Sequence, residues 1–367
     1  MKTPLSSFLL VSVLIVCLLL LAYLNDDDGL YAIEGAEVFR LDQSSKSAPV
    51  TNTFEKKETA DEFELTYGWN DFKRKTYSIN FSLSKQHLAE AEDEFGYNPE
   101  KLREFLAESM QIMRDEMMSH LTRFTTEQIL ASKYARYISM DNVSLKDFSI
   151  KLSAPPSISE EAKVEFGRIT DVINQEKEIY LQRIEKEQEK KRKEYLEKRG
   201  FRFTGDRMDL NYRLIVLNNR PRVKQVVEAM RKGSGKMSLN RFLALMLAFI
   251  QEIEYGLPPL KEEDKVILEF WVPPKVLVNN FGDCDSKGVT LASLWISFKK
   301  YPFLLIKIPK HLFVGVAIPS VGGGLTVNGI RYTLCEVAGP DLIPPGLITQ
   351  YSLLHLQGGN YRYELIK

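Results

Sequence analysis

The longest apolar run of the chain extends from Phe8 to Leu24, and a cluster of three aspartates follows it almost at once. Charged side chains enter hydrocarbon only at high cost, so this pattern predicts a membrane anchor or signal segment within residues 1–29. No convincing small-x-small cleavage site follows, which favours an uncleaved anchor over a removed signal peptide. Because Lys2 precedes the run and the acidic cluster follows it, we expect the body of the protein outside the cytoplasm, on the periplasmic or extracellular side.

Residues 30–62 are polar and unpatterned, as in a tether, and residues 63–156 carry the first mixed pattern. Apolar and polar positions alternate up to Leu83, which predicts a β-hairpin that ends there. Asn98 and Pro99 are of the types that favour a helix N-cap and a first helical position, and apolar residues recur at helical spacing after them. We therefore expect a small α+β N-terminal domain over this range.

The segment 157–200 is dominated by Glu, Lys, Gln and Arg, with opposite charges three and four positions apart. That spacing supports a long solvated helix, which at ~1.5 Å per residue extends roughly 50 Å or more. Its apolar residues hold no clean heptad, so a strong coiled coil is not predicted. We expect this helix, which Gly200 ends, to act as a spacer or arm.

Residues 201–367 mix helix and strand patterns and form the last predicted domain. A strand is expected over Met208–Asn219, then a short helix, then a buried helix that Ser238 caps. Three or four apolar strands follow nearer the C-terminus, where Asn328 and Gly329 give the strongest hairpin signal in the chain. The chain as a whole is predicted to be α+β.

Composition limits the classes of partner. Lys plus Arg equals Asp plus Glu at 49 each, so the overall charge points neither to nucleic acid nor to a strongly acidic substrate. Histidines and cysteines never occur at metal-ligand spacing, so we expect no metal and no cofactor. Outside the N-terminal run the cysteines are Cys284 and Cys335, and in an oxidising space they could also form one disulfide. The oligomeric state is left open.

Cys284 lies between Asp283 and Asp285, where two carboxylates should raise the pKa of a thiol. The residues that follow have the broad apolar face of a buried helix, so Cys284 is predicted to open that helix. Backbone N–H groups and the positive end of the helix dipole favour a thiolate there, and aspartates can cap the same amides. The pattern therefore predicts a reactive thiol despite its acidic neighbours.

A thiol nucleophile also needs a base. His311 heads an alternating apolar strand, and Glu336 lies on a later strand with Cys335 on the opposite face. The carboxylate of Glu336 could then orient the imidazole of His311. A cysteine at a helix start, a histidine on a following strand and a carboxylate on a later strand have the order that a nucleophilic thiol site requires.

Three stretches, FGDCDSKGVTLASL, HLFVGV and LCEVAGP, together resemble the transglutaminase-like superfamily, a branch of the papain-type cysteine enzymes. The upstream stretch LAFIQEIEY resembles that family's helix ending in Gln and Tyr. The resemblance covers about residues 238–339 and implies a Cys-bearing helix packed on an antiparallel sheet. It implies Cys284 as nucleophile, His311 as general base and acid, and Glu336, where many relatives have Asp, as the orienting carboxylate.

Acyl transfer also needs donors aimed at the developing oxyanion. The backbone N–H of Cys284 is one expected donor, and Gln251 and Trp271 are further candidates beside the site-lining Asp283 and Asp285. With these parts we expect a membrane-tethered cysteine protease or amidase that acts on a protein or peptide through a thioester. An amine in place of water would give cross-linking. The alternative is a non-catalytic binding or scaffolding protein that uses the papain-like domain as an interaction module.

Overall fold

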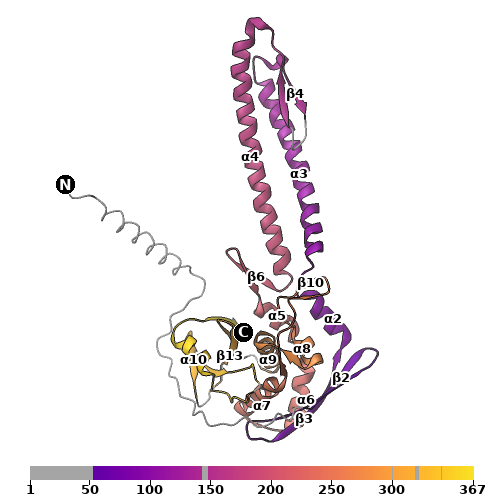
Figure 1. The fold of residues 1–367 in the computed structure, drawn as a ribbon, viewed down its shortest axis with the longest axis vertical. Coiled ribbons are helices and arrows are strands. Elements are labelled where there is room, and N and C mark those ends of the chain that lie inside the picture. The colour runs from indigo at the N-terminus through magenta and orange to yellow at the C-terminus, as the bar shows by residue number, and fades with distance from the viewer. Residues whose placement is uncertain (1–52, 143–147, 300, 319–321, 340) are drawn as a thin grey trace, which may run out of the picture.

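The computed structural model describes residues 53–142, 148–299, 301–318, 322–339 and 341–367. They form a mixed α+β body from which one long helical hairpin projects (Figure 1), so the predicted α+β class is confirmed. In this part of the chain the α-helices are α2 (Lys85–Glu94), α3 (Pro99–Leu130), α4 (Ser159–Glu197), α5 (Tyr212–Asn219), α6 (Lys224–Ser234), α7 (Leu239–Glu252), α8 (Pro273–Asn279), α9 (Cys284–Phe298) and α10 (Gln350–Gln357).

The strands fall into several sheets of different size. They are β1 (Thr53–Glu58), β2 (Glu62–Asn70), β3 (Thr76–Ser84), β4 (Ile138–Asn142), β5 (Ser149–Leu152), β6 (Phe201–Thr204), β7 (Arg207–Leu210), β8 (Glu254–Tyr255), β9 (Lys261–Glu262), β10 (Lys265–Val266), β11 (Phe281–Gly282), β12 (Phe303–Ile308), β13 (His311–Val316), β14 (Gly324–Val327), β15 (Ile330–Cys335) and β16 (Arg362–Ile366).

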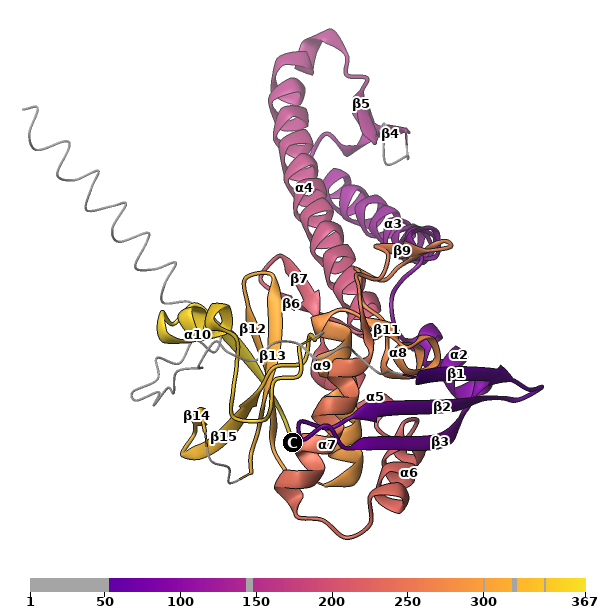
Figure 2. The ribbon, with the colours of Figure 1, turned by 60° about the horizontal axis from the view of Figure 1, so that its bottom comes forward.

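The largest described sheet has five antiparallel strands in the order β14-β15-β13-β12-β16. Asn328 and Gly329 both have positive φ, 50° and 74°, and turn β14 into β15 as the sequence predicts. Leu312 and Val314 of β13 belong to the core that contains α9, whereas Phe313 belongs to a second core to which α10 contributes. Helices α9 and α10 lie on opposite sides of this sheet (Figure 2). The sheet therefore separates two apolar layers.

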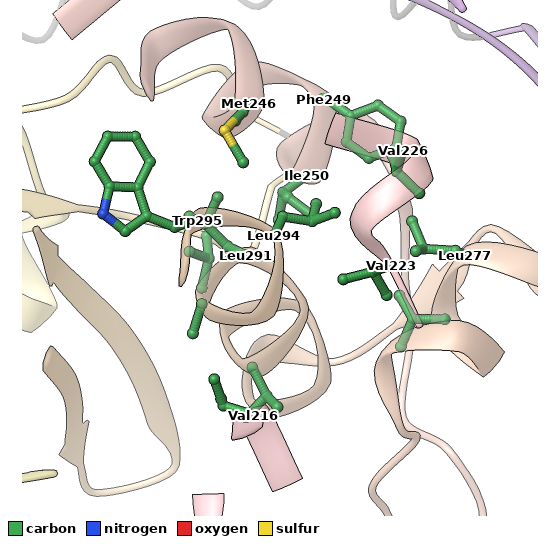
Figure 3. Close-up of a cluster of buried hydrophobic side chains, with 14 of the residues drawn as sticks. Val216, Val223, Val226, Met246, Phe249, Ile250, Leu277, Leu291, Leu294 and Trp295 are labelled. Atoms are coloured by element: carbon green, nitrogen blue, oxygen red, sulfur yellow. The ribbon is translucent and has the colours of Figure 1, made fainter. Parts of the chain in front are cut away.

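Helix α9 lies at the centre of the body and is buried along most of its length. Figure 3 shows how side chains from α5, α6, α7 and α8 gather around Leu291, Leu294 and Trp295. Gly288 lets the helix approach β13 closely, because a Cβ there would lie 2.4 Å from Cδ2 of Leu312. A helix that is apolar all round is typical of a core element. The first turn of α9, which carries Cys284, is thus held against the sheet.

Strands β1, β2 and β3 form an antiparallel sheet on the other side of these helices (Figure 2). Tyr67 and Trp69 pack edge-on against Phe249 of α7, with ring centroids 5.0 and 5.2 Å apart. The hydroxyl of Tyr67 also donates to the backbone carbonyl of Leu277 at 2.5 Å. The predicted hairpin is present as β2 and β3, but it shares its core with the C-terminal part of the chain, and β1 lies where a tether was expected.

Helices α3 and α4 pack side by side, and with β4 and β5 at their tip they make up the projecting helical arm (Figure 1). The 39 residues of α4 correspond to a helix of about 58 Å. Met117 and Leu121 of α3 are buried against Ile184 of α4, and His120 lies 2.7 Å from a carboxylate oxygen of Glu176. The predicted long charged helix is confirmed. Its buried Ile184 packs against α3, whereas Leu196, near its C-terminal end, is buried in the core of the body.

One predicted element has the wrong type. The strand expected over Met208–Asn219 ends at Leu210, and α5 follows. The side chain of Asn211 caps this helix by accepting a hydrogen bond from the N–H of Leu214 at 3.1 Å. The apolar run belongs to a helix because its buried positions recur at helical rather than alternating spacing: they are Tyr212, Ile215, Val216 and Asn219.

The expected membrane anchor needs correction. Within the ranges that the structure describes, no helix is both long enough and apolar enough to cross a membrane. The run from Phe8 to Leu24 lies outside the described residues. Membrane attachment through that run is therefore not supported, and neither is the location of the body outside the cytoplasm that was inferred from it.

Candidate active site

Cys284 is the first residue of α9, and the local sequence explains why the helix begins there. Asp283 is the N-cap, because its Oδ1 accepts a hydrogen bond from the backbone N–H of Ser286 at 2.9 Å. Just upstream, Asn280 adopts the left-handed conformation with φ of 49° and leads the chain from α8 into β11. The predicted helix start at Cys284 and the capping aspartate are both present.

The surroundings of the Cys284 thiol keep it protonated. The residue is 6% exposed, and its S–H donates to Oδ1 of Asp285 at 3.5 Å. Burial, followed by the charges of Asp285 and Asp283, raises the pKa of the thiol, while the nearby N–H of Leu312 acts in the opposite direction. In this geometry the helix end alone does not give the predicted thiolate, because burial and two carboxylates outweigh it.

Two side chains from other elements hold Asp285 in place. The hydroxyl of Tyr212, on α5, donates to Oδ2 of Asp285. Nζ of Lys307, on β12, lies 3.6 Å from the same oxygen and donates to the Tyr212 hydroxyl at 3.2 Å. Burial and then Asp285 raise the pKa of Tyr212, so its hydroxyl stays protonated and can donate. Asp285 is therefore a fixed negative charge beside the sulfur, and Lys307 partly balances it.

Asp283 is a titratable group near neutral pH. Burial, and after it the charge of Asp285, raises the pKa of its carboxyl to about 6. Below that pH the carboxyl is protonated, which removes one of the two charges that oppose a thiolate at Cys284.

His311 and Glu336 form a hydrogen-bonded pair between the first residue of β13 and the residue that follows β15. Nε2 of His311 is bonded to Oε1 of Glu336. The other carboxylate oxygen accepts hydrogen bonds from the hydroxyl of Ser352 at 3.0 Å and from the N–H of Thr349 at 3.4 Å. Glu336 is 2% exposed, so this carboxylate is fixed on both sides. The pairing leaves Nδ1 as the imidazole nitrogen that can exchange a proton with another group.

The structure places Cys284 beside the start of β13, but it does not join the sulfur to the imidazole. The N–H that influences the thiol is that of Leu312, the residue after His311. Within the described ranges, the hydrogen bonds of the sulfur and of the ring do not connect them. The alternation of β13 explains this separation, since Leu312 faces α9 whereas Phe313, on the same side as His311, faces the other layer.

Gln251 has a structural role in this arrangement. Its side-chain amide donates to the backbone carbonyls of Glu336 and Ile343 at 2.7 and 2.9 Å, and its Oε1 accepts from the N–H of Ile343 at 3.1 Å. The residue is 1% exposed. Both amide protons are therefore committed, and Gln251 holds the backbone of Glu336 rather than offering a free oxyanion donor.

Trp271 lies against the first turn of α9 without pointing its N–H at the sulfur. Its Nε1–H donates to a carboxylate oxygen of Glu262 at 2.7 Å, and its ring packs edge-on against Phe281 with centroids 5.3 Å apart. Its backbone N–H donates to the hydroxyl of Ser286 at 3.0 Å. The indole N–H is thus engaged elsewhere, as the amide of Gln251 is.

Two residues near Cys284 were not predicted. Tyr255 on β8 pairs with Gly282 and is 49% exposed, and its pKa is raised by burial and then by Cys284 and the two neighbouring aspartates. Lys287 is completely buried three residues after Cys284. A lysine inside an otherwise apolar helix pattern was a sequence signal for Lys287. Tyr255 ends the stretch LAFIQEIEY, which the family resemblance included without giving this tyrosine a role.

A cavity of about 410 Å³ opens beside the His311 and Glu336 pair. The rest of its wall comes from the end of β15 onward and from the β12–β13 turn: Lys310, Ala338, Gly339, Asp341, Ile343, Thr349 and Tyr351. A larger cavity of about 820 Å³ lies at the opposite end of α9, around Phe242 and Phe298. The smaller cavity is the one whose wall includes the hydrogen-bonded His311 and Glu336.

Three consecutive side chains could offer ligand atoms to a cation. One atom each from Asp283, Cys284 and Asp285 lies within 4.8 Å of the others. Asp283 is committed to the helix cap, and Asp285 to Tyr212 and Lys307. We therefore treat this cluster as the electrostatic environment of the thiol, and the prediction of no metal stays a prediction.

The two cysteines beyond the N-terminal run are both free, so the disulfide alternative is wrong. Cys335 is completely buried in the core that contains α9, on the face of β15 opposite Glu336, as predicted. Comparison of the chain with known protein families, with curated proteins and with solved structures finds no significant match.

Proposed function

We propose that the chain is a cysteine-dependent acyl-transfer enzyme of the transglutaminase-like, papain-type class, acting as a peptidase or amidase on protein or peptide substrates. The observation that carries this proposal is that His311, next in sequence to Leu312, whose N–H lies near the Cys284 thiol, is paired with the buried carboxylate of Glu336. Such a pair fixes the ring and stabilises the imidazolium that forms when it accepts a proton. Cys284, at the helix start next to Leu312, supplies the nucleophile.

The mechanism requires a local rearrangement of both the thiol and the imidazole. The S–H of Cys284 turns away from Asp285 and donates to Nδ1 of His311, which the pairing with Glu336 leaves available. In the resting structure the ring of His311 lies on the side of β13 that carries Phe313, opposite Leu312 and α9, so the ring also has to turn toward the sulfur. Hydrogen bonds between catalytic groups are often long in free enzymes and shorten when substrate binds.

The reaction then follows two steps, acylation of Cys284 and hydrolysis of the thioester. Nδ1 of His311 takes the thiol proton, the sulfur of Cys284 bonds to the substrate carbonyl carbon, and the imidazolium returns the proton to the leaving amine as the C–N bond breaks. Water next attacks the thioester and gives a proton to His311. The C–S bond breaks, the sulfur regains a proton, and a carboxylic acid leaves.

The oxyanion of each tetrahedral intermediate needs donors that the resting structure does not already use. The backbone N–H of Cys284 is one. The hydroxyl of Tyr255 is a better second candidate than Gln251 or Trp271, because Tyr255 lies next to the sulfur and is half exposed. Gln251 instead positions the backbone of Glu336.

A second function is favoured by a different observation. The thiol is buried, donates to Asp285 and has a raised pKa, which is the resting state of an unreactive cysteine. On this alternative the chain is a non-catalytic binding or scaffolding protein, and the cavity beside His311 holds a partner group without chemistry.

Acyl-enzyme trapping separates the two functions. The full chain is incubated with p-nitrophenyl acetate, an activated ester that makes little demand on specificity, and is quenched in acid. We expect a burst of nitrophenolate and an acetyl group on the peptide that carries Cys284, read by mass spectrometry. Cys284→Ala should abolish both, whereas the matched variant Cys335→Ala should retain them. A folded chain that shows no acetyl-Cys284 contradicts the enzymatic function and favours the binding module.

A further inference from the structure

Lys287 is a buried charge that the mechanism above does not use. It is 0% exposed, and its Nζ donates to the backbone carbonyls of Ile253 and Ala338 at 2.7 Å and of Gln251 at 3.3 Å. These are neutral acceptors. They satisfy its three N–H donors, but a buried ammonium that is not hydrogen-bonded to an anion still costs free energy, so the position calls for an explanation beyond packing.

The three carbonyls come from the two segments that flank the site. Gln251 and Ile253 lie at the end of α7, and Ala338 lies two residues after Glu336. Gly339 has φ of 64°, and a Cβ there would lie 2.3 Å from the carbonyl oxygen of Gln251. The segment that carries the carboxylate is therefore pressed against the end of α7, and Lys287 bonds to both.

The charges around Cys284 are unbalanced without Lys287. Asp283 and Asp285 are the carboxylates on its own helix, and Glu252 faces Lys287 from the end of α7. Tyr212 on α5 and Tyr255 on β8 are neutral, since their pKa values are raised. The other cationic or titratable groups nearby are Lys307 on β12, which lies against Asp285, and His311 on β13, which is bonded to Glu336.

Lys287 is the cation that is placed to act on the sulfur. It follows Cys284 by three residues, so the two side chains share one face of α9. Burial lowers the pKa of Lys287 to about 7, while Glu252, Cys284 and Asp283 raise it. Because an electrostatic interaction is mutual, the same attraction that favours the ammonium favours a thiolate at Cys284.

We propose that Lys287 is a positioning residue for Cys284: its buried ammonium ties the first turns of α9 to the segment behind Glu336 and supplies the charge against which the thiolate forms. The inference rests on the proposed function in that it takes Cys284 as the nucleophile. It also answers why a cysteine between two aspartates can react, since the compensating charge comes from the same helix.

The proposal has a definite pH dependence. Lys287 is charged below its pKa of about 7 and neutral above it. Its support of the thiolate is therefore present below pH 7 and is lost as the pH rises through 7. The rate of Cys284 alkylation should rise less steeply with pH above 7 than that of a thiol without such a neighbour.

The test measures Cys284 alkylation by iodoacetamide as a function of pH in the full chain, resolved by peptide mass spectrometry. Lys287→Gln keeps N–H donors for the carbonyls but removes the charge, and Lys287→Arg keeps the charge. We expect Lys287→Gln to lower the alkylation rate roughly tenfold at pH 6, where Lys287 is charged, and to change it little above pH 8, where Lys287 is neutral. Lys287→Arg should restore most of the loss at pH 6. Lys299→Gln, at the other end of α9, should change nothing.

A purely structural role gives a different result. Lys287→Gln would then lower the melting temperature and leave the rate of Cys284 alkylation at pH 6 in the folded chain unchanged, which overturns the proposal. Should neither variant fold, lysine NMR of the folded wild-type chain decides. Alkylation of Cys284 must then lower the titration midpoint of Lys287, and an unchanged midpoint overturns the proposal.

The alkylation assay needs no substrate, so the inference and the proposed function fail separately. An alkylation rate at pH 6 that depends on Lys287, in a chain that forms no acetyl-Cys284, supports the electrostatic coupling and contradicts the enzymatic function. An acetylated Cys284 whose alkylation rate at pH 6 does not depend on Lys287 supports the enzymatic function and contradicts the coupling.

Discussion

The thiol and the imidazole of the candidate site come from neighbouring elements, but their surroundings differ in charge and in hydrogen bonding. The imidazole of His311 lies beside a cavity and is bonded to Glu336, which two further donors fix in place. The thiol of Cys284 is buried between two carboxylates and donates to one of them. The imidazole on the sheet side of the site is therefore oriented by a carboxylate, whereas the thiol on the helix side keeps its proton.

This difference indicates that the state of the thiol controls the reactivity of the site. His311, already bonded to Glu336, requires only a group that donates a proton to it, whereas the Cys284 thiol must break its hydrogen bond to Asp285 and depends on nearby positive charge. Substitutions on the two sides should therefore act differently: those on the sheet side should lower the rate, and those among the acidic groups of the helix side should raise reactivity.

The largest expected effect is the loss of the nucleophile. Cys284→Ala should reduce acyl transfer by at least about 10³-fold, because no other group can form the thioester. Formation of acetyl-enzyme from an activated ester measures it, with Cys335→Ala as the matched control. Equal activity in both variants would show that the helix side of the site is not the reacting side.

On the sheet side, Glu336→Gln should lower the rate by roughly 10²- to 10⁴-fold, because an amide no longer stabilises the imidazolium or fixes its orientation. The rate constant of acylation at saturating ester is the readout. Glu364→Gln changes another largely buried glutamate, on β16 of the same sheet, and serves as the control. A rate that falls as much in the control as in Glu336→Gln would make the pairing with His311 merely structural.

On the helix side, Asp285→Asn should act in the opposite direction. Asp285 raises the pKa of the Cys284 thiol, so removing its charge lowers that pKa. We expect alkylation of Cys284 at pH 7 to become faster, by roughly tenfold if the thiol pKa falls by about one pH unit. Slower alkylation in a variant that melts like the wild type would mean that Asp285 assists the thiol instead of opposing it.

The smallest effect is expected at Trp271. Its N–H is bonded to Glu262, so Trp271→Phe should change the acylation rate by less than about threefold. Loss of an oxyanion donor would instead cost about 10²- to 10³-fold. A large loss in Trp271→Phe would therefore restore the role that the sequence suggested for this residue.

Local patterns predicted the elements that depend on local chemistry. The caps at Asn98, Ser238 and Asp283 are present, as are the Asn328 turn and the long charged helix. Alternation also placed Glu336 and Cys335 on opposite faces of β15 correctly. These features require only nearest-neighbour information.

Packing between segments that are far apart in the sequence could not be predicted from such local patterns. The partnership of α3 with α4, and the placement of β1 to β3 on the C-terminal core, depend on contacts between segments far apart in sequence. The same limit applies to Gln251 and Trp271, whose donors are committed to groups that the sequence does not reveal. The thiol pKa was expected to be low because the helix end was visible and the depth of burial was not.

The central claim is that His311 activates Cys284, and the pH dependence of Cys284 alkylation by iodoacetamide tests it most directly. It is measured in the full chain, in His311→Ala and in His355→Ala, a control on α10. The account predicts labelling at pH 7 that is the same in the wild type and the control and slows at least tenfold on loss of His311, with the midpoint displaced to higher pH in His311→Ala alone. The same rate and the same midpoint in all three chains would contradict it.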